Sequence, residues 1–271
     1  MSVLLELLAV QPGAGDSALA TGYGPEGKRV FGGQFVAQSM AAAAATVEGA
    51  AFVPMSMHLQ FLRGGAAAVP IVYTVERTYD GRTAASRRAL AHQADRLITA
   101  ATVSFATPLP GPEHGRYHGG TQPLPDDPET LEVTGPAGPA PGLPPGEFDI
   151  RMVDEGEGES FVRRLWWRTT VPMPDDPLVH ICAALFVTDV YMIDPALRVH
   201  GHSMADRSHR SGTTDSSVWF HRPIRADRWN LLESRSPAAA RGRGVITAEL
   251  VGADGLIAAT MVQEGLIAAR E

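Results

Sequence analysis

Hydrophobic and polar residues alternate along two stretches of this chain, and each stretch follows an apolar segment without such alternation. In the first stretch the apolar segment begins near Gln34 and runs to Val47, and its Ala and Met residues favour a helix. Gly32 and Gly33 come directly before this segment, and because glycine is disfavoured inside a helix we expect the helix to start after them. Four segments of alternating or β-branched residues follow, and they predict antiparallel strands at residues 55–62, 71–77, 86–92 and 97–105.

The second stretch repeats this order. An apolar segment at residues 178–193 predicts a helix, and strand-like segments follow at residues 217–221, 229–235, 244–251 and 256–265. When the chain is aligned with itself at an offset of 159, Phe61-Leu-Arg63 meets Phe220-His-Arg222 and Asp95 meets Asp254 without a gap. Two strand-rich regions can resemble each other by chance, but the coincidence of turns and strands favours an internal duplication.

The residues between the two stretches have a different composition. Residues 108–158 are dense in Pro and Gly, which interrupt regular structure, and they predict a linker over the surface. We therefore divide the chain into a first repeat at residues 1–107, this linker, and a second repeat at residues 159–271. Each repeat is expected to wrap an antiparallel sheet around one helix, an α+β arrangement. Pairing the two sheets edge to edge would remove two exposed edges.

Charge and cysteine content narrow the function classes. The chain has 271 residues and a net charge of -7, which disfavours binding of nucleic acid through phosphate neutralisation. Its one cysteine, Cys182, suits a reducing cytoplasm, and its apolar neighbours predict a buried thiol rather than a nucleophile. The N-terminal residues 1–10 are typical of a short amphipathic helix rather than a signal peptide. No apolar run of about 18 residues predicts a membrane span.

Several short motifs occur in a fixed order: Val30-Phe-Gly-Gly-Gln-Phe, His58-Leu-Gln-Phe-Leu-Arg, Pro174-Asp-Asp-Pro, Asp215-Ser-Ser-Val-Trp-Phe-His and Thr260-Met-Val-Gln-Glu-Gly. Together they resemble the TesB-like, or type II, acyl-CoA thioesterases. The resemblance implies a double hotdog fold, in which each of two tandem repeats has a central helix wrapped by an antiparallel sheet. It also implies an enzyme of lipid metabolism or biosynthesis that acts as a homodimer or homotetramer. Such an enzyme hydrolyses thioesters of coenzyme A or acyl-carrier protein to a free acid and a thiol, without a cofactor.

The same resemblance implies which residues activate the attacking water. By motif they are Asp189, Thr213 and Gln263. Thr214 is adjacent to Thr213, and a shift of one residue would exchange the two. A carboxylate can act as general base, while a hydroxyl and a carboxamide can hydrogen-bond a water.

Two of these residues also stand out by their surroundings. Asp189 lies in an apolar segment, where a carboxylate needs a partner or a cavity. A structural hydrogen bond to a strand is the alternative interpretation. Gln263 is polar in an apolar final strand, and strand alternation could equally turn it toward solvent.

Further residues are candidates for contact with the substrate. Gly32, Gly33 and Gln34 stand at a helix start, where free N–H groups and the helix dipole favour an oxyanion. A tight turn without a ligand is the alternative. His58 begins a predicted strand and is either a second contact or a structural histidine. Arg87, with its neighbour Arg88, could contact a phosphate, although surface ion pairs are the ordinary role.

Other catalytic chemistries find little support in the sequence. His200 and His202 lack a third ligand at metal spacing, so we expect no metal. The Gly-x-Ser-x-Gly motif is absent, which argues against a serine hydrolase of the α/β type.

The chain departs from the family pattern at two positions. Ser216 stands where the family has a histidine beside the site, and Gly64 replaces a proline. Ser216 is therefore both a candidate substrate contact and a reason to consider another reaction, such as nucleophile addition to an α,β-unsaturated acyl chain. A non-catalytic thioester-binding module is a third hypothesis. The presence of Asp189, Thr213 and Gln263 together speaks against it.

Overall fold

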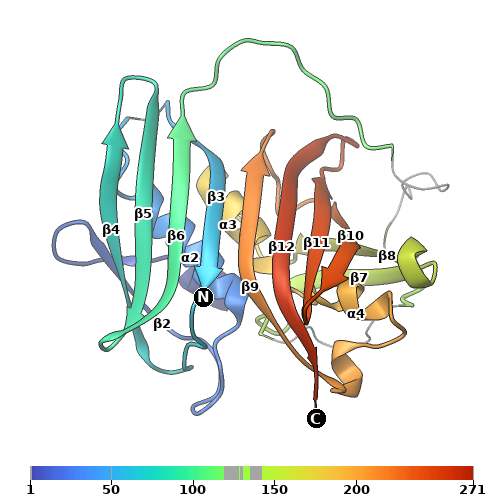
Figure 1. The fold of residues 1–271 in the computed structure, drawn as a ribbon. Coiled ribbons are helices and arrows are strands. Elements are labelled where there is room, and N and C mark those ends of the chain that lie inside the picture. The colour runs from blue at the N-terminus through green and yellow to red at the C-terminus, as the bar shows by residue number, and fades with distance from the viewer. Residues whose placement is uncertain (1, 50, 119–127, 129–130, 135–141, 271) are drawn as a thin grey trace.

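A computed structural model describes residues 2–49, 51–118, 128, 131–134 and 142–270, and these build one broad antiparallel sheet with two long helices behind it (Figure 1). The strands are β1 Gln11–Pro12, β2 Ser17–Thr21, β3 Val53–Phe61, β4 Pro70–Asp80, β5 Ala84–Gln93, β6 Arg96–Ala106, β7 Phe148–Glu155, β8 Val162–Thr169, β9 His209–Phe220, β10 Asn230–Ala240, β11 Arg243–Val251 and β12 Ile257–Ala269. The helices are α1 Val3–Leu8, α2 Gly32–Ala44, α3 Pro177–Val187 and α4 Asp194–Arg198, with short 3₁₀ turns η2 Gly158–Ser160 and η3 Met204–Asp206.

The order of the strands shows the duplication directly. Across the sheet the order is β1-β2-β4-β5-β6-β3-β9-β12-β11-β10-β8-β7, so corresponding strands of the two repeats stand at equal distances from the centre. At the centre β3 pairs with β9, with His58 opposite Ser217. The offset of 159 carries His58 onto Ser217, and this pair therefore marks the local two-fold axis between the repeats. The predicted α+β architecture of two helix-and-sheet repeats is confirmed.

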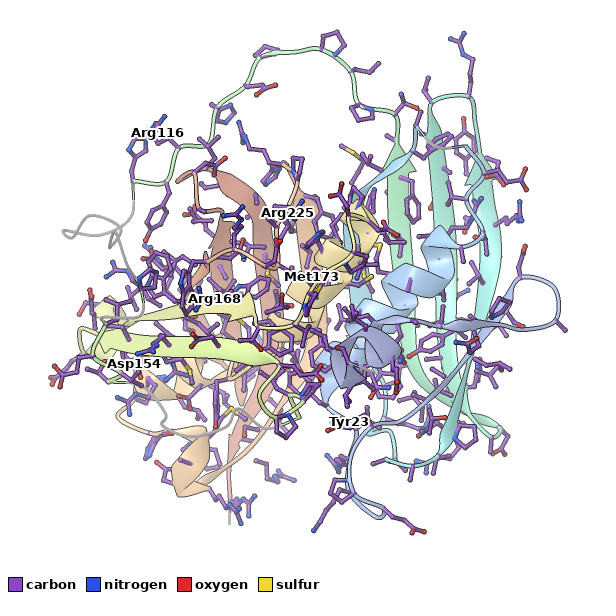
Figure 2. The ribbon with its side chains drawn as sticks, turned by 180° about the vertical axis from the view of Figure 1, so that it is seen from behind. Tyr23, Arg116, Asp154, Arg168, Met173 and Arg225 are labelled. Atoms are coloured by element: carbon purple, nitrogen blue, oxygen red, sulfur yellow. The ribbon has the colours of Figure 1, made fainter. Side chains whose placement is uncertain are left out.

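The two long helices lie side by side on one face of the sheet, as the view from behind shows (Figure 2). At their crossing the sulfur of Cys182 lies 3.5 Å from the carbonyl oxygen of Ala37. Cys182 is buried, as predicted, and burial raises the pKa of its thiol to about 12, which disfavours the reactive thiolate. A Cβ atom on Gly33 would lie 2.1 Å from the carbonyl oxygen of Phe186, so this close approach requires glycine. Helix α2 begins at Gly32, two residues before the predicted start.

Three features differ from the sequence prediction. Strand β7 lies inside residues 108–158, so the linker prediction does not hold for Phe148–Glu155. It pairs with β8, which was also not predicted, and together they extend the sheet as β1 and β2 do on the other side. The apolar segment at 178–193 is not one helix, because α3 ends at Val187 and Tyr191 has a positive φ of 52°. The proline-rich residues 135–141 lie outside the described residues, and the boundaries of the three regions stay a prediction.

The N-terminal residues form α1, as expected, with Leu4, Leu7 and Leu8 buried against the core. None of the helices in the described part of the chain has the length and apolar character needed to cross a membrane.

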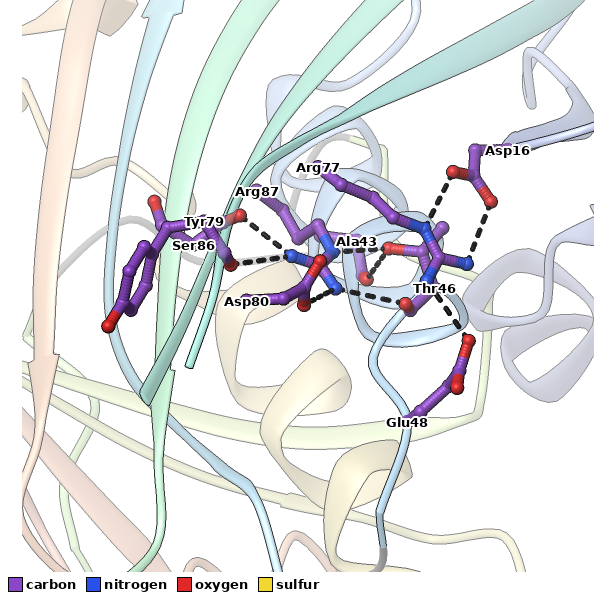
Figure 3. A network of polar contacts seen from close by, with 9 residues as sticks. All are labelled: Asp16, Ala43, Thr46, Glu48, Arg77, Tyr79, Asp80, Ser86 and Arg87. Carbon is purple, nitrogen blue, oxygen red and sulfur yellow. Dashed lines mark hydrogen bonds and ion pairs between the residues drawn. The ribbon is translucent and has the colours of Figure 1, made fainter. Parts of the chain in front are cut away.

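A buried arginine closes the end of α2 against the first repeat's sheet (Figure 3). Arg87 is fully buried, and its Nε donates to the Thr46 hydroxyl at 2.8 Å. Its other nitrogens donate to the carbonyl oxygens of Thr46, Tyr79 and Ser86, and one forms an ion pair with Asp80 at 2.5 Å. Arg87 therefore holds the fold together, and it does not offer the exposed cation that we considered for phosphate binding.

We expect Arg87→Met to lower the free energy of unfolding by about 2–4 kcal/mol, because the carbonyl groups of Thr46, Tyr79 and Ser86 lose their donor and the bond to Thr46 is buried. Arg88→Met is the matched control, since Arg88 is exposed and its one ion pair, with Glu76, is long at 4.0 Å. This substitution should change the free energy of unfolding by at most about 0.5 kcal/mol. Urea denaturation of both variants measures the difference. Equal midpoints for the two variants would contradict the stabilising role of Arg87.

Candidate active site

Asp189 lies at the meeting point of the two repeats. It follows the C-terminal end of α3, and the start of α2 stands directly opposite. A Cβ atom added to Gly32 would lie 2.4 Å from Oδ2 of Asp189. The backbone N–H groups of Gly32 and Gly33 lie near this carboxylate and lower its pKa. Phe31 at the N-cap position of α2 supplies no side-chain hydrogen bond, and a carboxylate of the second repeat stands at the start of this helix of the first.

The surroundings of Asp189 bring its pKa close to neutral pH. Burial raises the pKa of Asp189 from its ordinary value of 3.8 to about 7. Hydrogen bonds from the Thr213 hydroxyl and from the amides of Gly33 and Gly32 act in the opposite direction. A carboxylate with such a pKa can accept a proton at physiological pH and release it again.

A β-bulge selects Thr213 over Thr214. In the pairing of β9 with β12, Asp215 faces Glu264 and Thr213 faces Gly265, which leaves Thr214 as the extra residue. The bulge lets Thr213 donate to Oδ1 of Asp189 at 3.2 Å, while Thr214 donates to Glu264. Backbone geometry thus brings Thr213, and not Thr214, into contact with Asp189, and the catalytic role of Thr213 stays a prediction.

Gln263 and Ser216 form a second polar pair on the same two strands. Both side chains are buried, and Nε2 of Gln263 donates to the Ser216 hydroxyl at 3.2 Å. Oε1 of Gln263 has no hydrogen-bond partner among the described residues. Gln263 therefore faces the core rather than solvent. A buried amide oxygen without a partner suits a position for water or substrate.

A pocket of about 200 Å³ opens beside Asp189. Apart from Asp189 and Thr213, its lining is mostly apolar and comes from four places in the chain: Phe31, Val190–Ile193, Met204 and Gly212. Only Asp189 and Thr213 were predicted as site residues. The others carry no signal in the sequence that separates a pocket wall from the core.

Two predicted substrate contacts are engaged elsewhere. Oε1 of Gln34 accepts from the backbone N–H of Tyr23 at 2.9 Å, and its Nε2 donates to the carbonyl of Thr21 at 2.8 Å. His58 is exposed between inward-facing neighbours on β3, and its Nδ1 lies 2.7 Å from the Ser217 hydroxyl. The structure therefore does not bring His58 together with Asp189. Within the described residues, no three His, Cys, Asp or Glu side chains are grouped to hold a metal.

Comparison with known proteins finds acyl-CoA thioesterases in the family models and among the relatives alike. Residues 19–106 match the family described as acyl-CoA thioesterase N-terminal domain, and residues 121–267 match the acyl-CoA thioesterase C-terminal domain. The chain is 30% identical over 263 residues to human acyl-coenzyme A thioesterase 8, a match that covers 89% of this chain and 81% of that one. It is also 30% identical to acyl-CoA thioesterase 2 of Haemophilus influenzae over 252 residues, which cover 89% of this chain and 88% of that one.

Solved structures show the same similarity. The crystal structure of the acyl-CoA thioesterase II TesB2 from Mycobacterium marinum superposes with a TM-score of 0.82 at 28% identity, and 99% of each chain is covered. A hotdog-fold protein from Alicyclobacillus acidocaldarius, at 18% identity and a TM-score of 0.80, shares the fold over the full length of both chains. The double hotdog architecture is confirmed.

The raised pKa of Asp189 predicts a pH-dependent cost to stability. Between pH 3.8 and about 7 the folded state binds more protons than the unfolded state, so this group lowers the stability as pH rises through that range. We expect Asp189→Asn to be more stable than the wild type by about 1–2 kcal/mol at pH 8, since each pKa unit corresponds to about 1.4 kcal/mol and partial exposure relieves some of the cost.

Thermal or urea unfolding at several pH values tests this expectation. The advantage of Asp189→Asn should disappear as the pH approaches 4. Asp254→Asn, in an exposed turn, is the control and should show no such dependence. A lower stability of Asp189→Asn at pH 8 would contradict the assignment of a destabilising buried charge.

Proposed function

This chain belongs to the acyl-CoA thioesterase family whose N-terminal and C-terminal domains it matches, and we propose that Asp189, Thr213 and Gln263 activate the water that cleaves its substrate. As a member of that family it is a thioester hydrolase, which splits acyl-CoA into a free acid and coenzyme A. The non-hydrolytic alternative is not favoured, because the relatives are named as thioesterases.

The observation that carries the proposed site is the Thr213–Asp189 contact of 3.2 Å at an apolar pocket. Asp189 accepts a proton from water as the water attacks the thioester carbonyl, since its pKa lies near 7. Thr213 donates to Oδ1 and fixes the orientation of the carboxylate. Gln263 positions the water through the amide atom that has no partner among the described residues.

The start of α2 acts on the proposed base Asp189 in this mechanism, whereas the sequence led us to expect that it binds the oxyanion. The N–H groups of Gly32 and Gly33 lie near Asp189 and lower its pKa. They favour the ionised base, and the positive end of the helix dipole also favours the negative charge that develops on the substrate. Ser216 takes part by holding Gln263 at 3.2 Å, which gives the residue that replaces the family's histidine a role in positioning.

The carrier, the assembly and the location belong to the same proposal. Coenzyme A is the first candidate carrier, and acyl-carrier protein is the second. We propose a cytoplasmic homodimer or homotetramer, and the single buried Cys182 agrees with a reducing compartment.

Substitution of the two adjacent threonines tests the site with a built-in control. Thr213→Val should lower kcat/KM for acyl-CoA by about tenfold to a hundredfold, because a hydrogen bond to a charged group contributes about 1.5–3 kcal/mol. Thr214→Val should stay close to the wild type, since Thr214 bonds to Glu264. Asp189→Ala should lose about a hundredfold or more, as expected for removal of a general base. Thiol release detected by a colour reagent measures all three, and equal losses in the two threonine variants would refute the arrangement.

The pH profile tests the role of Asp189 separately. Activity of the wild type should rise with pH and level off above about 7, where Asp189 is ionised. The hydroxyl of Thr213 lowers the pKa of Asp189, so Thr213→Val should move the midpoint of the profile to higher pH while Thr214→Val leaves it in place. A midpoint that is the same in all three proteins would rule out Asp189 as the titrating base.

A further inference from the structure

We infer that the pocket beside Asp189 receives the acyl chain and limits it to medium length, with Ile193 and Met204 as the limiting walls. This inference rests on the proposed hydrolysis at Asp189 and names the class of substrate for that site.

The chemistry of the lining suits a hydrocarbon chain. Phe31, Val190, Met192, Ile193 and Met204 supply apolar surface, and Asp189 with Thr213 supplies the polar part. None of the described residues that line the pocket is a lysine or arginine. The phosphates of coenzyme A therefore have no cation to meet there, whereas an acyl chain gains by leaving water.

The volume sets the length of the chain. A cavity of about 150 Å³ can take up benzene, which has six carbon atoms, so each carbon needs ~25 Å³. A pocket of about 200 Å³ then holds roughly eight carbon atoms, the size of an octanoyl group.

The walls are held in place by a buried ion pair. Asp194 is 1% exposed, and its Oδ1 accepts the backbone N–H of Met204 at 2.6 Å. Its Oδ2 lies 2.8 Å from Nη2 of Arg163, which also pairs with Asp154 at 2.7 Å. Nη1 of Arg163 donates to the carbonyl of Tyr191 at 3.4 Å, so one arginine holds the Tyr191 segment directly and Met204 through Asp194.

Ile193 also has no room to move away from the pocket. A Cβ atom on Gly265 would lie 2.4 Å from Cδ1 of Ile193, which means that the isoleucine already packs against the bare backbone of β12. Ile193 is 2% exposed. A longer chain must therefore displace a packed side chain, and the limit is rigid rather than adaptable.

A series of straight-chain esters from acetyl-CoA through octanoyl-CoA to palmitoyl-CoA tests this inference by thiol release. The wild type should reach its highest kcat/KM near octanoyl-CoA and fall by about tenfold or more at palmitoyl-CoA. Ile193→Ala should move the optimum to longer chains, and Met204→Ala, at a half-buried position, should do the same with less risk to folding. Ile71→Ala removes the same atoms from a buried site of the first repeat and should leave the optimum unchanged.

Asp194 is a positioning residue in this scheme, and its own variant separates that role from general stability. Asp194→Asn should broaden the chain-length profile, with a larger loss of kcat/KM for octanoyl-CoA than for palmitoyl-CoA, because the walls lose their fixed anchor. A uniform loss at all lengths would indicate a purely structural role.

The outcomes distinguish the limit on chain length from the hydrolysis on which it rests. Equal kcat/KM for octanoyl-CoA and palmitoyl-CoA in the wild type, or unchanged optima in both wall variants, would overturn the length limit and leave hydrolysis standing. Absence of thiol release from every ester would overturn the proposed hydrolysis itself.

Discussion

The close packing of α2 against α3 is the constraint on which the site depends. Gly33 lets the backbone of the first helix approach the carbonyl of Phe186, and this brings the start of α2 against Asp189. The carboxylate then faces the N–H groups of Gly32 and Gly33, which have no partner within their own helix, and these groups lower its pKa. A bulkier residue at either glycine would separate the helix from the carboxylate. The packing of the helices and the pKa of Asp189 therefore follow from one contact between the repeats.

The local two-fold axis also defines a second position, where the described residues do not repeat the arrangement around Asp189. Thr46 and Thr188 each donate to the carbonyl three residues earlier, so Val47 corresponds to Asp189. The pairing of corresponding strands places Pro54 at the position of Thr213 and Val103 at that of Gln263. A pocket of about 270 Å³ remains beside Val47, with the charged residues Glu48, Arg77 and Asp80 in its lining. It lacks counterparts of Asp189, Thr213 and Gln263, and the Arg87 network secures the fold beside it.

The sequence predicts the repeated architecture because strand alternation and turn positions are local properties. It also predicts Asp189, since a carboxylate in an apolar segment needs a reason to be there. It does not predict β7 and β8, because Pro-rich and acidic neighbours conceal their pattern. The break of the second helix depends on the backbone of Tyr191, and the choice of Thr213 depends on a bulge. Such features arise from strand pairing and long-range packing, which no local pattern records.

The position of Asp189 at the start of α2 has a consequence for how the two halves of the chain depend on each other. The proposed base belongs to one repeat, and the amides that lower its pKa belong to the other. Sliding α2 along α3 by even one turn would remove these donors and leave a bare carboxylate in an apolar environment. Neither repeat alone contains a complete site, and turnover is therefore a direct readout of the register between the two helices.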